Sequence, residues 1–166
     1  MNPWLERRLG ARLRAVANFV EGPTVADIGS DHGYLPAYLL QSGRAERMII
    51  VDKHAAPLER ARQALERTLK GRCEFRLGDG LEAIYEGELD CLSMCGFGAL
   101  QMARILSAHP QRVPALVVLQ SQDDPQPLRE WGPQAGFALQ AELAVGPYWV
   151  LVWRDRRFRG NFSGGV

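Results

Sequence analysis

Two aspartates and two glycines alternate within one short turn, and no other residues of this sequence are better suited to bind a ligand. The pattern is Asp27-x-Gly29-x-Asp31-x-Gly33, between an apolar run typical of a strand and one typical of a helix. Glycines in such a strand–turn–helix unit let the backbone approach a ligand closely. The two carboxylates would repel a pyrophosphate, whereas they suit a cationic ligand with hydroxyl and ammonium groups. The turn therefore favours a cationic ligand over a dinucleotide.

S-adenosylmethionine is a ligand of that kind. An acidic residue stands where a G-x-G-x-x-G dinucleotide fingerprint has its middle glycine, so the turn indicates a methyltransferase more than a nicotinamide enzyme. Backbone N–H groups around Gly33, at the start of the helix, are suited to hold the carboxylate of the methionine moiety.

Two further aspartates follow expected strands. Asp52 ends the second strand, 25 residues after Asp27, close to the spacing of a ribose-binding carboxylate. Asp79 follows the third strand and is suited to accept a hydrogen bond from an adenine amino group. Taken alone, each aspartate is typical of a helix cap or a turn. Because ligands of open α/β sheets bind at the carboxyl ends of the strands, their shared location predicts a single site.

The segment Cys95-Gly96-Phe97-Gly98 follows the fourth expected strand, where methyltransferases hold the methyl acceptor. Enzymes that methylate exocyclic amino groups carry an Asn- or Asp-Pro-Pro-aromatic motif there, and this sequence has none. A ring nitrogen with a free lone pair needs no such acceptor, so a ring nitrogen is the favoured target. Phe97 is suited to stack on a base or to pack into the core. His32 and Tyr34 are interpreted either as pocket residues or as structural ones.

Apolar periodicity and glycine or proline breaks divide the chain into alternating helices and strands. Helical spacing of leucine and valine from Leu5 to Val20 predicts one amphipathic helix, ended by Glu21-Gly22-Pro23. Further helices are expected at 33–40, 57–70, 99–108 and 127–134, and strands at 24–28, 48–51, 73–77, 89–94, 115–119, 137–143 and 148–154.

Alternating strands and helices predict a parallel sheet with right-handed crossovers and helices on both faces. The last two strands are separated by a short turn at Gly146-Pro147 and predict an antiparallel hairpin. A nicotinamide-binding domain would continue with parallel strands. The fold class expected is therefore an α/β, Rossmann-like class I methyltransferase with a mostly parallel seven-stranded sheet and a C-terminal antiparallel hairpin.

The 166 residues fit one domain, and a composition that is 46% hydrophobic and 23% charged is ordinary for a globular protein. No apolar stretch approaches the length of a membrane span, and three cysteines outside any CxxC pair predict a reduced, cytoplasmic protein without structural zinc. The net charge of +1 divides into +3 in residues 1–20, +3 from Val150 onward and −5 between them. The basic ends are interpreted either as binding an RNA backbone or as the result of a genome composition that favours arginine over lysine.

The run Asp-Ile-Gly-Ser-Asp-His-Gly-Tyr-Leu-Pro within Val25–Leu40 resembles the signature of the bacterial TrmK-like tRNA adenine-N1 methyltransferases. The resemblance implies a class I enzyme that uses S-adenosylmethionine to methylate N1 of an adenine in the D arm of tRNA. Other stretches that agree with this family are Arg12-Leu13-x-x-Val16-Ala17-x-Phe19-Val20, Ala56-Pro57-Leu58-x-x-Ala61, Leu77-Gly78-Asp79-Gly80-Leu81, Leu119-Gln120 with Leu128-Arg129-x-Trp131, and 142–148.

The resemblance puts a set of acidic residues, glycines and their neighbours on cofactor-binding positions. The catalytic hypothesis is direct transfer to adenine N1, with Asp31 stabilising the positive charge that the adenine acquires and with Gly96 and Phe97 at the acceptor. The predicted cofactor-binding residues are Asp27, Gly29, Asp31, His32, Gly33, Asp52, Lys53, Asp79, Gly80 and Cys95, and no metal ligand is expected.

The chain departs from the family pattern in two places. The family's Ala-Gly-Met-Gly-Gly reads Cys95-Gly96-Phe97-Gly98-Ala99, and the family's helical, coiled-coil-like C-terminal domain is not expected in a chain that stops at Val166. The expected organisation is an N-terminal helix packed on the domain (1–22), a methyltransferase domain (23–155) and a basic, flexible tail (156–166), working as a monomer or weak homodimer with tRNA as its partner.

Three alternatives remain open from the residues. The first is a methyltransferase acting on another RNA or on a small molecule. The second is a non-catalytic module that binds S-adenosylmethionine or RNA. The third, a nicotinamide-linked dehydrogenase, is the least favoured because an acidic turn opposes pyrophosphate.

Overall fold

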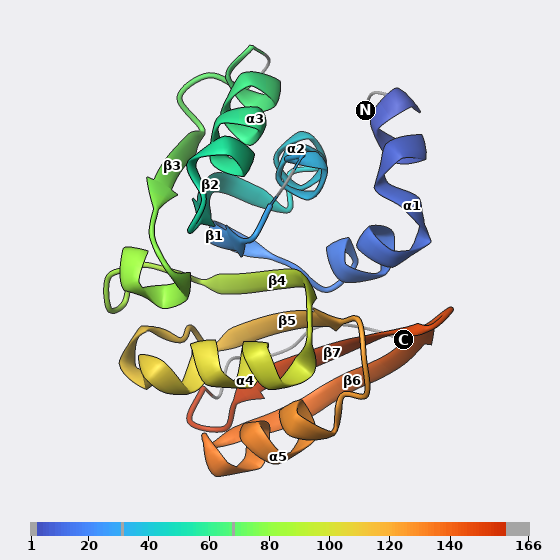
Figure 1. Cartoon of the computed structure of the whole chain (residues 1–166), viewed down its shortest axis with the longest axis vertical. Helices are drawn as coiled ribbons and strands as arrows, with labels where there is room; N and C mark the ends of the chain where they lie inside the picture. The colour runs from blue at the N-terminus through green and yellow to red at the C-terminus, as the bar shows by residue number, and fades with distance from the viewer. Residues whose placement is uncertain (1–2, 31, 68, 159–166) are drawn as a thin grey trace.

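The computed structural model describes residues 3–30, 32–67 and 69–158, which form a seven-stranded sheet flanked by helices on both faces (Figure 1). The predicted alternation of elements is confirmed, and two short 3₁₀ helices, η1 and η2, were not foreseen. In chain order the elements are α1 (Pro3–Ala17), β1 (Gly22–Ile28), α2 (Tyr34–Gln41), β2 (Ala45–Asp52), α3 (Ala55–Glu66), β3 (Cys73–Leu77), η1 (Gly80–Ala83), β4 (Cys91–Phe97), α4 (Ala99–Ala108), η2 (Pro110–Arg112), β5 (Leu116–Ser121), α5 (Gln126–Gln134), β6 (Phe137–Val145) and β7 (Tyr148–Asp155).

The strand order is β3-β2-β1-β4-β5-β7-β6. Neighbouring strands from β3 to β5 pair in parallel, whereas β7 pairs antiparallel with both β5 and β6. The hairpin prediction is therefore confirmed, and β7 is inserted between β5 and the edge strand β6. The order in which strands are added reverses at β1, because β2 and β3 lie on one side of it and β4 and β5 on the other, so ligands are expected beyond the carboxyl ends of these central strands.

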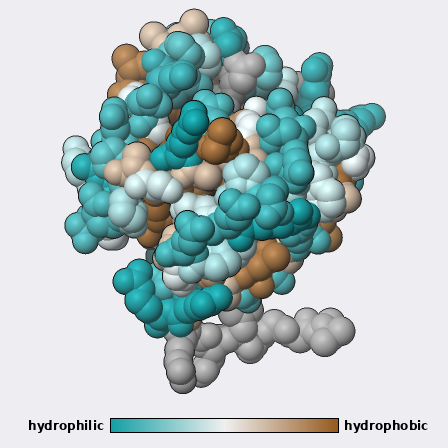
Figure 2. Space-filling model, turned by 60° about the horizontal axis from the view of Figure 1, so that its bottom comes forward, coloured by the Kyte–Doolittle hydropathy of each residue, from teal (hydrophilic) through white to brown (hydrophobic). Residues whose placement is uncertain are grey.

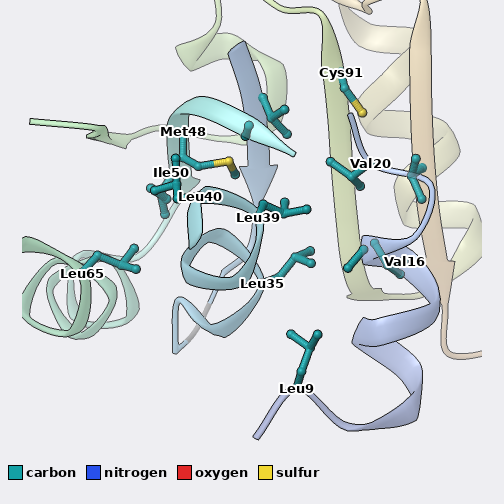
Figure 3. Packing of buried hydrophobic residues seen from close by; sticks show 14 of the residues in the cluster. Leu9, Val16, Val20, Leu35, Leu39, Leu40, Met48, Ile50, Leu65 and Cys91 are labelled. Atoms are coloured by element: carbon teal, nitrogen blue, oxygen red, sulfur yellow. The ribbon is translucent and has the colours of Figure 1, made fainter. Parts of the chain in front are cut away.

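Two hydrophobic clusters lie on opposite faces of the sheet. One joins the sheet to α1, α2 and α3, and the other joins it to η1, α4 and α5. In the first cluster, Leu35 and Leu39 of α2 point toward Val16 and Val20 in the N-terminal segment (Figure 3). The central strands are apolar on both faces because both faces are covered, as Met48 to Val51 of β2, all fully buried, illustrate.

Helix α1 differs from the single helix that its leucine spacing predicts. It breaks at Gly10, which has φ 66° and ψ 171°, and it ends at Ala17 rather than near Glu21 (Figure 1). Glycine adopts this positive φ without the steric penalty of a Cβ atom. Arg14 Nη2 donates to the Glu6 carbonyl oxygen over 2.9 Å and so joins the two halves. The break turns the second half along the sheet, where α1 contacts β5, β6 and β7.

Strand β4 is longer than predicted, because Cys95 to Phe97 belong to it rather than to a following loop. The pairing with β5 shifts between Cys95 and Phe97, which leaves Gly96 as a bulge with φ 83°. The Gly96 N–H donates to Oε1 of the buried Gln120 on β5 over 3.0 Å, so the bulge keeps a hydrogen-bond partner. The bulge redirects the strand end just where the acceptor segment was expected.

The face shown in Figure 2 is mainly hydrophilic, with hydrophobic side chains in small separate patches. In the part of the chain that is described, no helix combines the length and apolar character needed to span a bilayer. At the basic C-terminal end, Arg157 pairs with Asp155 over 2.6 Å and Arg154 with Glu21 over 3.6 Å. From Arg159 onward, the predicted tail lies outside the described residues.

Candidate functional site

Two neighbouring cavities lie beyond the carboxyl ends of β1, β2 and β4. The first, of about 220 Å³, is lined mainly by the ends of β2, β3 and β4 and by α4. The second, of about 480 Å³, is lined by α1, the β1–α2 turn and the residue after β5. Gly29, Cys95 and Gly96 line both cavities, so these three residues mark a shared seam. A ligand that occupies both cavities must pass over this seam.

The first cavity collects the predicted residues that follow β2 and β3. Asp52 and Lys53 reach it from the end of β2 and the residue after it, and Asp79 and Gly80 from the start of η1. Asp52 Oδ1 accepts a hydrogen bond from the His54 N–H over 2.8 Å, which fixes the carboxylate in the turn. Its other oxygen has no partner among the described residues and is available to a ligand.

Side chains of two arginines hold the segment that carries Asp79 in place. Arg76 Nη1 donates to the Ala83 carbonyl oxygen and to Glu88, each over 2.8 Å, and its Nη2 reaches Glu88 over 2.5 Å. From the other side, Arg112 Nη1 donates to the carbonyl oxygens of Leu81 and Glu82, each over 3.0 Å. These contacts anchor residues 78–88 against β3 and so position one wall of the first cavity.

The second cavity contains a buried carboxylate at the end of β1. Asp27 is 3% exposed and accepts a hydrogen bond from Ser93 Oγ over 2.7 Å. Burial raises the pKa of this carboxyl from 3.8 to about 6, although hydrogen bonds from Ser93 and Ser30 oppose the shift. Among the residues that the structure describes, no cation pairs with Asp27. The site therefore holds a negative group whose ionised form a cationic ligand would stabilise.

Helix α1 supplies the basic side chains of this cavity, which the sequence-based site prediction did not include. Arg8 and Arg12 line it opposite the β1–α2 turn, and the Arg12 guanidinium lies 5.3 Å from the centre of the Tyr148 ring. This cation–π contact joins the first helix to the last strand. The basic character of residues 1–20 was visible in the sequence, but its place in the site depends on how the broken α1 packs.

Gly29 and Phe97 are in direct contact at the seam. A Cβ atom on Gly29 would lie 2.5 Å from Phe97 Cζ, and Gly29 has φ 79°, so only glycine fits there. Phe97 packs against the second hydrophobic cluster and lines the first cavity. Within the described residues, its ring therefore lies on the side of Asp52 rather than in the cavity of Asp27.

The other predicted residues fall around the second cavity and the seam. Gly33 is buried at the start of α2, and the exposed His32 stacks on Tyr34 with ring centres 5.4 Å apart. Burial raises the pKa of the Cys95 thiol well above its usual value, with a further contribution from the Asp27 charge, so this thiol stays protonated. Asp31 lies outside the described residues. No cluster of three or more potential metal ligands occurs in the described ranges.

Comparisons with known proteins agree with this geometry. A family model described as a methyltransferase domain matches residues 9–148. A tRNA (adenine(22)-N(1))-methyltransferase of Bacillus subtilis is 34% identical over 174 aligned residues, covering 97% of this chain and 73% of the relative.

Two similar crystal structures are the B. subtilis M1A22 tRNA methyltransferase TrmK and M. capricolum TrmK in complex with S-adenosylhomocysteine. The first has a TM-score of 0.81 and 33% identity over 87% of this chain and 65% of its own. The second has a TM-score of 0.80 and 28% identity over 89% of this chain and 69% of its own. The chain thus spans about two thirds of the length of these structures.

Proposed function

The chain belongs to the TrmK family of tRNA (adenine-N1)-methyltransferases, and we propose that it transfers a methyl group from S-adenosylmethionine to N1 of an adenine in tRNA. The observation that carries the proposal is the pair of cavities joined at a glycine seam, with Asp52 on one side and Asp27 on the other. By its relatives' substrate, the protein would act in the cytoplasm on the D arm of tRNA.

The residues of the two cavities fit the functional groups of S-adenosylmethionine. A carboxylate with one free oxygen, as in Asp52, accepts hydrogen bonds from ribose hydroxyls, and the exposed Asp79 accepts from an adenine amino group. Asp27, which is buried and has no cationic partner among the described residues, suits the ammonium group of the methionine moiety. Arg12 and the backbone N–H groups at the start of α2 suit its carboxylate. We therefore assign the first cavity to adenosine and the second to methionine.

Methyl transfer requires little proton chemistry from the protein. S-adenosylmethionine supplies an electrophilic methyl group on a sulfonium. Adenine N1 is unprotonated at neutral pH, so the site needs no general base, and its main contribution is alignment, worth up to roughly 7–11 kcal/mol in favourable cases. N1 lies on the Watson–Crick edge, so the protein must hold the base unpaired or flipped out.

Three residues of the acceptor prediction receive distinct roles. Gly96, which adds no side chain to the seam, leaves room for the base to approach. Phe97 forms part of the wall of the first cavity and packs against Gly29. Asp31 stays the proposed carboxylate that stabilises positive charge on the adenine ring. The Arg8 side chain, which also lines the second cavity, suits a phosphate that flanks the base.

Methyl transfer to tRNA that lacks the modification tests this function. The wild-type protein and labelled S-adenosylmethionine should yield 1-methyladenosine, and Asp52→Ala should abolish it by removing the ribose contact. Glu86→Ala removes an exposed carboxylate outside both cavities and should leave the rate unchanged. Cofactor binding without any methylated tRNA would contradict the assigned substrate, and failure to bind S-adenosylmethionine would contradict the assigned cofactor.

A further inference from the structure

Gln122 is the one side-chain amide that lines the second cavity within the described residues. Its Nε2 atom lies 3.5 Å from the position that a Cβ atom would take on Gly96. The amide therefore stands beside the seam on the side of Asp27, where the acceptor must meet the methyl group. It makes no side-chain hydrogen bond with any residue that the structure describes.

The backbone around Gln122 is held firmly on both sides. The Gln122 N–H donates to the Phe97 carbonyl oxygen over 3.1 Å, which ties the residue to the end of β4. Ser121 Oγ donates to Asp123 Oδ1 over 2.9 Å, and the same oxygen accepts from the Ala99 N–H over 2.7 Å. The segment after β5 is thus fastened to the start of α4, and only the side chain of Gln122 extends into the cavity.

The chemistry of the reaction limits which edge of the adenine such an amide can contact. N1 must face the methyl group, so the Watson–Crick edge turns toward the seam. The Hoogsteen edge, with one N6–H donor and the N7 acceptor, stays available to the protein. A glutamine amide pairs with this edge through two hydrogen bonds, accepting from N6–H and donating to N7.

We propose that Gln122 reads the target adenine through this Hoogsteen pair and thereby determines the base specificity of the site. The inference rests on the proposed function, because it requires a base whose N1 accepts the methyl group. The pair also assists the reaction itself. As N1 forms its bond to carbon, positive charge spreads to N6, and the hydrogen bond from N6–H to Gln122 Oε1 strengthens.

The test combines a protein variant with an atomic change in the substrate. The substrate is tRNA with 7-deazaadenosine at the position that the wild-type protein methylates, which removes the N7 acceptor and keeps N1 and N6. We expect kcat/KM to fall about 5- to 150-fold for Gln122→Leu on ordinary tRNA, the range for a lost bidentate pair. The wild-type protein should also lose activity on the deaza substrate, and Gln122→Leu should lose nothing further.

A second variant separates the two hydrogen bonds. Gln122→Glu keeps an acceptor for N6–H but sets a second carboxylate oxygen against the N7 lone pair, so its rate on ordinary tRNA should lie below that of the wild-type protein and should rise, not fall, with the deaza base. Gln134→Leu, an exposed glutamine at the end of α5, is the matched control and should behave as the wild-type protein does. Affinity for tRNA in the presence of S-adenosylhomocysteine gives a readout independent of turnover and should follow the same pattern.

The outcomes distinguish this inference from the proposed function. Two results would overturn the assignment of Gln122 and leave the function intact. One is an equal rate of the wild-type protein on ordinary and deaza tRNA. The other is a further loss of rate when Gln122→Leu is combined with the deaza base. An inactive wild-type protein that still binds S-adenosylmethionine would overturn the function and this inference together.

Discussion

Replacing Asp27 by asparagine should stabilise the fold at neutral pH and weaken cofactor binding at the same time. The carboxyl is buried, and its pKa rises from 3.8 to about 6 because burial disfavours the charged form. Near pH 7 the folded protein therefore contains an ionised group that would be better hydrated in the unfolded chain. Asparagine has nearly the same shape and can still accept from Ser93 Oγ, but it carries no charge.

The size of this effect follows from the two pKa values. A difference of about two units corresponds to about 3 kcal/mol, since each unit is 1.36 kcal/mol. Between pH 3.8 and 6 the folded state binds more protons than the unfolded state, so stability falls as the pH rises. Relative to Asp27→Asn, the wild-type protein should lose about 3 kcal/mol of unfolding free energy from below pH 3.8 to above pH 6. If the NH₂ group of the new asparagine finds no hydrogen-bond acceptor, the variant loses some stability, but this loss is the same at every pH.

Urea unfolding followed by tryptophan fluorescence measures this difference, because Trp131 and Trp153 are buried and report the loss of the core. Urea unfolding of both proteins is measured at pH 3.5 and again at pH 7.5. Other carboxylates titrate in both, so the difference between the two proteins isolates Asp27. If the two proteins differ in unfolding free energy by the same amount at both pH values, the reasoning is refuted. That result would mean that ionising Asp27 does not destabilise the folded state.

The same variant tests the assigned ammonium contact. Asp27→Asn should bind S-adenosylmethionine more weakly than the wild-type protein does at pH 7.5. Wild-type affinity should fall as the pH drops through about 6, because protonation removes the charge. Equal or tighter binding by the variant at pH 7.5 would show that another group holds the ammonium.

Two further substitutions test the packing and the cavity wall. Gly132→Ala places a Cβ atom 2.2 Å from Trp153 Cζ3 in the core and should lower the unfolding free energy by about 1–3 kcal/mol, measured by thermal melting; an unchanged melting temperature would contradict this contact. Arg76→Met releases residues 78–88 from β3 and should weaken S-adenosylmethionine binding about tenfold with little change in circular dichroism. Arg47→Met, which removes an exposed partner of Glu74, is its matched control and should bind as the wild-type protein does, so equal losses in both variants would argue against a role of the tethered turn.

The order of elements was predictable because strong local signals mark it. Continuous apolar runs such as Met48 to Val51 predict strands covered on both faces, and glycine or proline breaks separate them from amphipathic helices. The reversal of the last strand was also predictable, because two strand-like runs join through the short Gly146-Pro147 turn. Parallel topology then brings Asp27, Asp52 and Asp79 to one edge of the sheet.

Features that depend on contacts distant in sequence were not predictable. The apolar spacing of α1 continues through Gly10, so the pattern hides the break. The bulge at Gly96 depends on a hydrogen bond to Gln120, which lies 24 residues away in the sequence. Arg12 and Gln122 were missed as site residues because neither follows one of the strands at whose ends the site was sought by an acidic or glycine motif. They enter the second cavity only after α1 and the segment after β5 have packed around the β1–α2 turn.

The contact of α1 with the last strands has a consequence for synthesis on the ribosome. Helix α1 contacts β5, β6 and β7, and its Arg12 meets Tyr148 at the start of β7. At roughly 5–20 residues per second, Tyr148 is added about 7 to 27 seconds after Arg12. During this interval α1 can pack against α2, but its contacts with the last two strands are not yet formed. The described residues that line the second cavity are complete once Gln122 has been added, whereas α1, which carries the two arginines of that cavity, gains its contacts with β6 and β7 only when the hairpin follows.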